Sequence, residues 1–289
     1  MKLSIENHVI RKTFGDEKAI EMIAQAGFDA MDFSFYWMPK AENILDREDR
    51  LDYANRLRAL ADRHGLAVTQ AHAPFDLKLT DAPEKQAYDY DQIRRSIEFS
   101  GILGVKQIIV HNLTTANPAD FIDTNLAFFR SLEDVCSKSG VRVAVENLWS
   151  MKDGRIVGGR LSTARELGAF LDRLNPEHFC GCIDLGHAEI VDEDSASFIR
   201  GLGTPRLHAL HVQDTDLTRD SHMLPYLGKH NWAEITRALA EVRYEGDLTF
   251  EIFAFLNSFT KEALSGALRF AHTIGRGLIG EIDKASAQA

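Results

Sequence analysis

Nine acidic or imidazole side chains occur at the ends of short apolar runs in this chain, or just after them. A carboxylate or an imidazole in such a place costs free energy unless a partner compensates for its lost hydration. Because nine residues share this placement, we expect them to surround one charged object, and a divalent metal ion or a metal cluster fits best. The nine residues are His72, His111, Glu146, Asp184, His187, His211, Asp220, His222 and Glu251.

Four of the nine are the first candidates for metal ligands. Glu146 follows the run VRVAV, Asp184 follows CGCI and Glu251 follows LTF. Acidic residues are seldom buried without a partner. One such carboxylate alone could cap a helix or meet an arginine, but three in equivalent places favour a shared cation. With the His211 imidazole they form an oxygen-rich set, which favours Mn²⁺ over a closed thiolate zinc site, with Mg²⁺, Co²⁺ and Zn²⁺ as alternatives.

Three histidines are assigned to substrate binding or to a second metal position. His72 and His111 end two apolar runs, where an imidazole can also simply bond a backbone carbonyl. His187 lies three residues after Asp184 in the segment IDLGH. We expect His187 to point back toward the ligands, and the alternative is a solvated histidine at a helix start.

Asp220, His222 and Trp37 complete the candidate set. Asp220 and His222 form an Asp-x-His pair, which is assigned, like the three histidines above, to substrate binding or to a second metal position. That pair precedes a Pro/Gly turn in the segment 219–232, where a solvated loop is the alternative. Trp37 belongs to an aromatic cluster at the end of an apolar run. Loop packing is the more common role of such clusters, but Trp37 could stack on the face of a sugar.

Eight apolar, strand-like runs alternate with helical patterns along the chain. Since parallel strands need crossover helices, this alternation predicts a parallel sheet. Eight units in 289 residues match one α/β domain, a single (β/α)8 barrel over residues 1–289. A doubly wound open sheet competes, but no Gly-rich dinucleotide fingerprint follows the first run. The predicted strands are 3–6, 28–34, 66–72, 107–112, 141–147, 179–184, 207–214 and 247–252.

The helical patterns have apolar residues three and four apart, and two of them end at the C-cap signals Gly27 and Gly65. The tail, residues 282–289, is expected to fray. In such a barrel the active site lies at the carboxyl ends of the strands, so all nine candidates can converge on one mouth. The predicted helices are 16–27, 47–65, 89–104, 119–140, 161–175, 194–203, 231–246 and 260–277.

Composition excludes several classes of function. The formal net charge is −10, from 33 basic and 43 acidic residues, which argues against a surface that tracks nucleic-acid phosphates. No apolar stretch approaches the length of a membrane span and the first residues lack a signal peptide's apolar core. Cys180 and Cys182 alternate in a predicted strand and are interpreted as small core residues, so a reducing cytoplasm is the expected setting. The sequence leaves open whether the protein forms a homo-oligomer.

Seven segments of the chain resemble the xylose-isomerase-like TIM-barrel superfamily. That group holds sugar isomerases and epimerases, inosose dehydratases and metal-dependent apurinic endonucleases. The motifs cover about residues 66–253 and the architecture covers the whole chain. The segments are AHAPFDL (71–77), IIVHN (108–112), VAVENLWS (143–150), CIDLGHAEI (182–190), HVQDTD (211–216), RDSHMLPYLGKHNW (219–232) and TFEIF (249–253).

The resemblance implies different roles in different branches. Resemblance to the sugar isomerases and epimerases implies that Glu146, Asp184, His211 and Glu251 hold the metal. It also implies that the two glutamates move protons on opposite faces of the substrate, and that His187 contacts the substrate. Resemblance to the endonucleases implies instead that all nine residues hold three zinc ions.

Departures from the endonuclease pattern favour the sugar branch. Asn-Leu-Thr follows His111 where the endonucleases usually have Pro-Gly, and the residues after Glu251 lack their Thr-Pro step. We therefore predict a metal-dependent isomerase or epimerase that acts on a small sugar, polyol or keto-sugar by proton transfer next to a carbonyl. The alternatives are a zinc-dependent apurinic endonuclease and an inosose dehydratase-like lyase. Nucleic acid and membranes are not expected partners.

Overall fold

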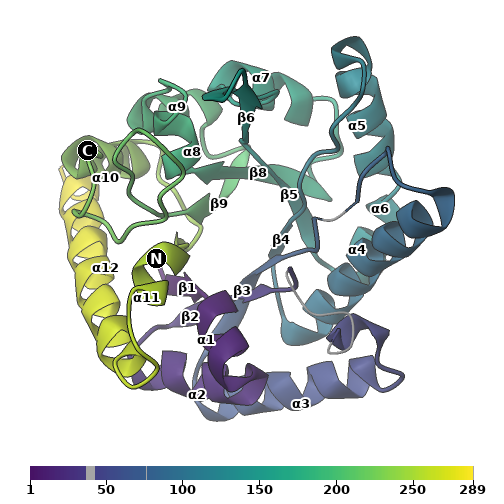
Figure 1. Ribbon diagram of the computed structural model, residues 1–289. Coiled ribbons are helices and arrows are strands. Elements are labelled where there is room, and N and C mark those ends of the chain that lie inside the picture. Colours follow the sequence, from purple (N-terminus) through teal and green to yellow (C-terminus); the bar gives the residue numbers. More distant parts are fainter. Residues whose placement is uncertain (37–42, 76, 289) are drawn as a thin grey trace.

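The computed structural model describes residues 1–36, 43–75 and 77–288, in which eight parallel strands form a nearly closed (β/α)8 barrel. Figure 1 looks into the barrel, with the helices arranged around the strands. The sheet order is β10-β1-β2-β3-β4-β5-β8-β9. The strands are β1 (Leu3–Glu6), β2 (Ala30–Ser34), β3 (Ala67–His72), β4 (Gln107–Ile109), β5 (Arg142–Glu146), β8 (Phe179–Asp184), β9 (Leu207–His211) and β10 (Leu248–Phe250).

The ring of strands is brought together between β9 and β10. The backbone N–H of Val212 donates to the Thr249 carbonyl (2.8 Å), and the N–H of Glu251 donates to the Val212 carbonyl (3.2 Å). Val212 and Phe250 form the corresponding parallel bridge. The prediction of a (β/α)8 barrel is therefore confirmed, and the open doubly wound sheet is wrong.

Nine of the twelve α-helices of the described residues surround the strands, and two of the predicted ranges, 89–104 and 119–140, need correction here. The helix expected at 89–104 begins earlier, at Pro83, because proline is tolerated in the first turn of a helix. The helix expected at 119–140 is two helices, and the Ser131 hydroxyl between them donates back to the Phe128 carbonyl (2.6 Å). The nine are α2 (Asp16–Gln25), α3 (Arg50–Arg63), α4 (Pro83–Leu103), α5 (Phe121–Arg130), α6 (Glu133–Ser139), α7 (Ala164–Leu171), α9 (Ser195–Leu202), α10 (Trp232–Glu241) and α12 (Leu264–Ser286).

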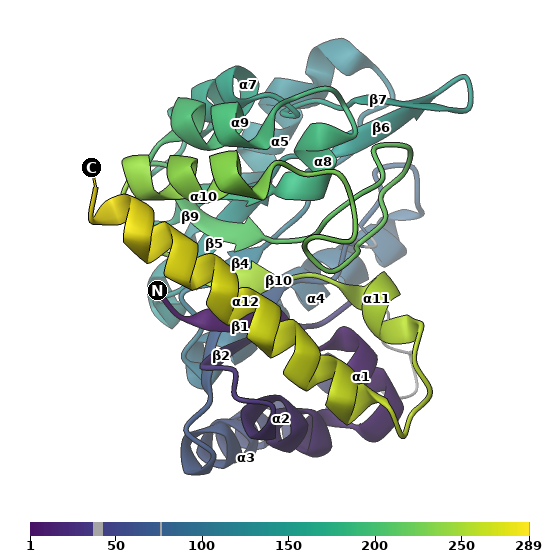
Figure 2. The same cartoon turned by 90° about the vertical axis from the view of Figure 1, so that its left-hand side faces the viewer.

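Short elements on the loops were not predicted. They include an antiparallel hairpin of β6 (Trp149–Lys152) and β7 (Arg155–Gly158), which projects from the mouth at the upper right of Figure 2. Asp153 and Gly154 form its two-residue turn, both with positive φ (51° and 74°), and Asp-Gly is the preferred pair for such a turn. The other elements are α1 (His8–Phe14), α8 (Leu185–Glu189), α11 (Phe253–Asn257) and the 3₁₀ turns η2 (Ile44–Asp46) and η3 (Pro118–Asp120).

The core has two layers, because neighbouring strand residues point to opposite faces. The larger apolar cluster lies between strands and helices and takes residues such as Val143, Val145 and Ile183. A separate cluster of smaller side chains, including the free and buried Cys180 and Cys182, alternates with them on the inner face. This agrees with the interpretation of the two cysteines as core residues. The inner cluster consists of Ile109, Ala144, Cys180, Cys182 and Ala209.

Helix α12 packs along β1 and overturns the prediction of a frayed tail. The helix continues to Ser286, and Ile282 within the supposed tail is only 4% exposed. Burial of that side chain offsets the entropy of ordering the last turns. Among the described helices, none is both long and apolar enough to cross a membrane.

Two glycines of α12 provide a matched test of this packing. An added Cβ at Gly275 would meet Cδ1 and Cδ2 of the fully buried Leu3, the latter at 2.7 Å, whereas at Gly277 it would meet nothing within 4 Å. We expect Gly275→Ala to lower the free energy of unfolding by about 1–3 kcal/mol through overpacking. Gly277→Ala should raise it by about 0.5–1 kcal/mol through helix propensity. Urea unfolding measures both, and equal effects would contradict the packing of α12 against β1.

Candidate active site

The nine candidate residues lie together at the carboxyl-terminal mouth of the barrel. His72, Glu146, Asp184 and His211 are the last residues of β3, β5, β8 and β9. Glu251 follows β10 directly and His111 follows β4 by two residues, while the other three lie in α8 and in the loop between β9 and α10. Trp37 lies outside the described residues, so its position is not assigned.

The centre of the site is the His211 ring, whose Nδ1 atom faces three carboxylates. Oε1 of Glu146 lies 2.7 Å from this nitrogen, Oε2 of Glu251 lies 3.4 Å away and Oδ2 of Asp184 lies 3.9 Å away. All four side chains are buried, and their ligand atoms lie within 4.8 Å of one another. Four donor atoms so close together can surround a single ion.

The charges of this cluster are unbalanced without a cation. Burial alone would raise the pKa of Glu146, but the charges and hydrogen bonds of His211 and His111 outweigh it and hold this pKa well below its usual range. Burial and the charges of Asp184 and Glu146 raise the pKa of Glu251 well above its usual range. In the described part of the chain, every ion-pair partner of these three carboxylates is a histidine.

A divalent metal ion fits this cluster. Three carboxylates and one imidazole nitrogen are donors that Mn²⁺, Mg²⁺, Co²⁺ and Zn²⁺ accept. A bound cation would stabilise the ionised form of all three buried acids at once. Glu146, Asp184, His211 and Glu251 would hold it.

His72 positions His211 by stacking. The two rings lie 4.4 Å apart between centroids and are inclined by 20°. Nε2 of His211 is buried and has no hydrogen-bond partner among the described residues, so stacking takes the place of the usual second hydrogen bond. The Nδ1 atom of His72 lies 3.0 Å from Oδ1 of the fully buried Asp32. Burial lowers the pKa of His72, but Asp32 outweighs it and raises this pKa to about 9.

His111 approaches the same cluster from the solvent side. Its Nε2 atom lies 3.0 Å from Oε2 of Glu146, and its side chain is 28% exposed. The ring stacks on Phe75 with centroids 4.8 Å apart. His111 therefore contacts the outer oxygen of a candidate ligand and stays accessible to a substrate.

His187, Asp220 and His222 form a second cluster beside the first. Nε2 of His187 lies 3.2 Å from Oδ2 of Asp220, and Nε2 of His222 lies 3.1 Å from Oδ1 of the same carboxylate. Burial alone would raise the pKa of Asp220, but the two histidines hold it well below its usual range. Burial lowers the pKa of His187, but Asp184 and Asp220 outweigh it and raise this pKa to about 10. Among the described residues, His222 thus groups with His187 and Asp220 rather than with His72 and His111.

Gln213 joins the two clusters and was missed in the sequence. Its Nε2 atom donates to both oxygens of Asp184 (3.1 and 3.0 Å) and to Oδ1 of Asp220 (3.0 Å). Its Oε1 atom accepts from the backbone N–H of His222 (2.7 Å). An uncharged amide after an apolar run carries little sequence signal, although Gln213 follows His211 by two residues and would share its face in the predicted strand 207–214.

The side chains of Asn147 and Asp214 hold the backbone around the site in place through hydrogen bonds. The Asn147 side chain pairs with the backbone of Asp184, accepting from its N–H (2.7 Å) and donating to its carbonyl (3.0 Å). Asp214 accepts from the backbone N–H of Tyr226 (2.9 Å) and from the Trp232 indole (2.9 Å). These bonds fix the loop that carries Asp220 and His222.

Loss of the Gln213 amide is expected to weaken metal binding and the fold together. Gln213→Ala removes the one amide that donates to both Asp184 and Asp220, so we expect a loss of about 2 kcal/mol in the free energy of unfolding. The dissociation constant for Mn²⁺ should rise about 10–100-fold. Gln92→Ala is the matched control, because Gln92 is also buried and donates to an aspartate, Asp46 (2.9 Å), in another part of the fold. Calorimetric titration that finds equal Mn²⁺ affinity in both variants would contradict this role.

A cavity of about 150 Å³ opens over the two clusters. Its walls combine the acidic and imidazole groups with three aromatic rings. Such a chamber offers hydrogen-bond donors, acceptors and apolar faces to a small polar ligand. The lining residues are Tyr36, His72, Phe75, His111, Glu146, His187, Asp220, His222, Glu251 and Phe253.

The chain belongs to the family of xylose isomerase-like TIM barrels, whose family model matches residues 20–271. A curated relative, the uncharacterized protein y4fM of Sinorhizobium fredii, is 30% identical over 167 residues, and this match covers 55% of the chain and 51% of that protein. The D-psicose 3-epimerase of Enterocloster bolteae is 26% identical, over 84% of the chain and 79% of that enzyme. The probable endonuclease 4 of Haloarcula marismortui is 28% identical, over 57% of the chain and 61% of that protein.

Solved structures share the same fold. The D-psicose 3-epimerase of Clostridium cellulolyticum has a TM-score of 0.74 at 19% identity, with 96% of this chain and 99% of that chain covered. A xylose isomerase domain protein of Alicyclobacillus acidocaldarius has a TM-score of 0.76 at 15% identity, with 98% and 99% covered. These likenesses agree with the barrel.

Proposed function

We propose that this protein is a divalent-metal-dependent isomerase or epimerase of a small keto-sugar, sugar or polyol. One observation carries the proposal: Glu146 and Glu251, at the carboxyl ends of separate strands, both face the His211 nitrogen within a buried four-donor cluster. Two carboxylates at one site can remove a proton from one face of a carbon and return one to the other. The likeness to D-psicose 3-epimerases in sequence supports the proposal.

The metal would stabilise, by electrostatic attraction, the negative charge that develops on the substrate's carbonyl oxygen. Mn²⁺ is the proposed ion, because carboxylate oxygens outnumber nitrogen in the cluster and, among the described residues, no thiolate joins it. Among these donors, Glu146 and Glu251 are the proposed bases. Isomerisation between neighbouring carbons needs one of them, whereas epimerisation needs both.

The surrounding side chains would bind and orient the substrate. His111 holds the outer oxygen of Glu146 and remains partly exposed, so it can also donate to a substrate hydroxyl. His187 and the Asp220 carboxylate offer a second set of donors and acceptors at the chamber wall. The aromatic rings of Phe75 and Phe253 line the chamber and would exclude water from the polar groups beside them, which strengthens these interactions.

A three-metal endonuclease is the second candidate, favoured by the compact group of His187, Asp220 and His222. Their ligand atoms also lie within 4.8 Å of one another, and a probable endonuclease 4 is among the relatives. Against it, the chain carries ten more acidic than basic residues, whereas duplex binding relies on lysine and arginine at several phosphates. An inosose dehydratase-like lyase would use the same metal and bases on a cyclic polyol.

Metal content and a substrate screen test the proposal together. The protein would be loaded with Mn²⁺, analysed for bound metal, and assayed on keto-hexoses, pentuloses, inososes and DNA with an abasic site. We expect one tightly bound ion per chain and turnover of a keto-sugar. Three zinc ions per chain with cleavage of abasic DNA and no sugar turnover would replace the proposal by the endonuclease.

A further inference from the structure

A groove continues from the chamber toward the β6–β7 hairpin. Its volume is about 1010 Å³, against about 150 Å³ for the chamber, and Phe75 and His111 line both. Trp149 makes a further connection, because it lines the groove while its indole N–H donates to Oδ2 of Asp220 in the chamber (3.2 Å). The groove is therefore an extension of the site and not a separate surface hollow.

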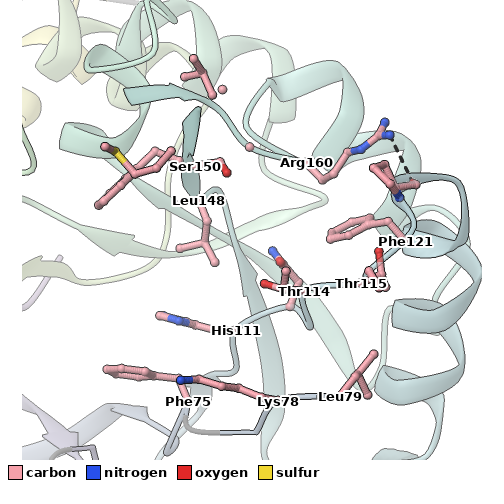
Figure 3. A pocket seen from close by; sticks show the side chains of 18 of the residues that line it. Phe75, Lys78, Leu79, His111, Thr114, Thr115, Phe121, Leu148, Ser150 and Arg160 are labelled. Carbon is pink, nitrogen blue, oxygen red and sulfur yellow. Dashed lines mark hydrogen bonds between the residues drawn. The ribbon is translucent and has the colours of Figure 1, made fainter. Parts of the chain in front are cut away.

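Three loops at the mouth form the groove: those after β3 and β4, and the hairpin that follows β5. The base of the hairpin is tightly closed, because a Cβ at Gly159 would collide with the carbonyl oxygen of Leu148. The hairpin is thus closely packed at its base. Figure 3 shows one side made of Phe75, Lys78 and Leu79, the opposite side of Leu148 and Ser150, and between them His111 and Thr114.

The groove lining alternates apolar faces with hydroxyl groups. Phe75, Leu148 and Trp149 offer flat or apolar surface, and Thr114 and Ser150 offer hydroxyls. A sugar ring has the same division, with C–H faces and a rim of hydroxyls. The lining therefore matches a second sugar ring better than a purely apolar group.

The charged side chains of the groove do not select an anionic occupant. Lys78, Lys152 and Arg160 also line it, but all three are exposed, and the Arg160 guanidinium donates to the Pro118 carbonyl (3.2 Å). The carboxylate-bearing Glu166 lies in the same lining. Exposed cations are well hydrated and add little binding energy.

Asn112 adds an unused hydrogen-bond donor to this lining. Its Nδ2 atom is buried and has no partner among the residues that the structure describes. Such a group costs free energy, and each one in a native fold calls for an explanation. Rotation of the amide toward the groove would let a ligand hydroxyl accept from it.

We propose that the natural substrate is a glycosylated keto-sugar, with its reacting ring in the chamber and its glycosyl substituent in the groove. The inference rests on the proposed function and deepens it. A free monosaccharide would occupy the chamber alone and leave the larger groove unused. A two-ring substrate uses both, and the binding energy of the second ring holds the first in place.

The test compares sugars that share one reacting unit. D-fructose, lactulose and isomaltulose contain the same fructose unit, which is free or carries a glycosyl group at O4 or O6. D-fructose 6-phosphate tests an anionic substituent. Uptake of solvent deuterium by each sugar, with the Mn²⁺-loaded protein, gives kcat/KM. We expect at least one of the two disaccharides to exceed both D-fructose and its phosphate at least tenfold.

Thr114→Trp fills the groove without touching the chamber, since Thr114 is exposed and lines only the groove of the two cavities. It should lower kcat/KM for the disaccharide at least tenfold and change that for D-fructose less than twofold. Thr114→Ser, the matched control, should change neither. Equal kcat/KM for free and glycosylated fructose, a preference for the phosphate, or equal losses on both sugars in Thr114→Trp would overturn the inference.

Absence of deuterium in every sugar would count against the proposed function rather than the groove. Calorimetric binding of the disaccharides and D-fructose then decides the inference independently. Binding of a disaccharide at least tenfold tighter than D-fructose, and lost in Thr114→Trp, supports it. Equal binding of the free and glycosylated sugars contradicts it.

Discussion

Glu251→Gln is expected to lower kcat for the keto-sugar substrate by about 10³-fold, because the glutamine keeps the shape of the side chain but cannot accept a proton. Glu251 Oε2 faces the His211 nitrogen at 3.4 Å and Oε1 faces Nε2 of His72 at 3.5 Å, so the group has a fixed position. Saturation with Mn²⁺ should not restore kcat. Glu245→Gln, on an exposed loop residue near β10, is the control and should change kcat less than twofold.

Glu251→Gln is also expected to change the free energy of unfolding of the metal-free protein, which is an effect independent of catalysis. A carboxyl group whose pKa is raised in the folded state destabilises the fold once pH exceeds its unfolded pKa, since ionisation is easier in the unfolded chain. The pKa of Glu251 is raised well above its usual range by burial and by Asp184 and Glu146. At neutral pH, the free energy of unfolding of metal-free Glu251→Gln should therefore be at least about 1 kcal/mol higher than that of the metal-free wild type. Full recovery of kcat at high Mn²⁺ would assign Glu251 to metal binding alone.

Asp184→Asn is expected to abolish tight metal binding and, with it, activity. Asp184 is fully buried, and its Oδ2 atom lies 3.9 Å from Nδ1 of His211 while its Oδ1 atom accepts from the His187 N–H (2.7 Å) at the start of α8. Asparagine caps a helix as well as aspartate does, so the fold should persist. Elemental analysis of the purified variant should find bound Mn²⁺ reduced at least tenfold.

Thermal unfolding gives a second measure of this loss. Mn²⁺ at 100 times its dissociation constant should stabilise the wild type by about 2.7 kcal/mol, or roughly 5 °C in Tm. Asp184→Asn should lose that shift. The control is Asp194→Asn, because Asp194 caps α9 in the same way, accepting from the Ser197 N–H (2.7 Å), but lies away from the site. An undiminished shift in Asp184→Asn would remove Asp184 from the ligand set.

The barrel could be predicted from the sequence because each strand is a short apolar run bounded by polar residues. The apolar pattern does not predict where a strand ends before its apolar run does. For example, β4 ends at Ile109, although the apolar run continues to Val110. That early end leaves His111 outside the sheet and partly exposed. Short loop helices such as α8 and α11 have too few residues to display a helical period. The β6–β7 turn did carry a readable signal, Asp153-Gly154.

The convergence of charged residues followed from strand-end placement alone, since parallel strands of a barrel share one mouth. Their pairing did not follow, because it depends on side-chain geometry. Asp32, two residues before the end of β2, holds His72, and its run FDAMDFS gave no reason to choose it. The amides Gln213 and Asn147 carry no charge, so their bonds to Asp184 are visible only in three dimensions.

Turnover in D₂O tests proton transfer at the Glu146–Glu251 pair most directly. The Mn²⁺-loaded protein would convert its keto-sugar substrate in D₂O, and mass spectrometry with NMR would locate deuterium in the product. We predict deuterium on the carbon next to the carbonyl, because a carboxylate that takes a proton there exchanges it with solvent or returns one from it. Product with no carbon-bound deuterium would contradict the account and point to a hydride shift or to hydrolysis.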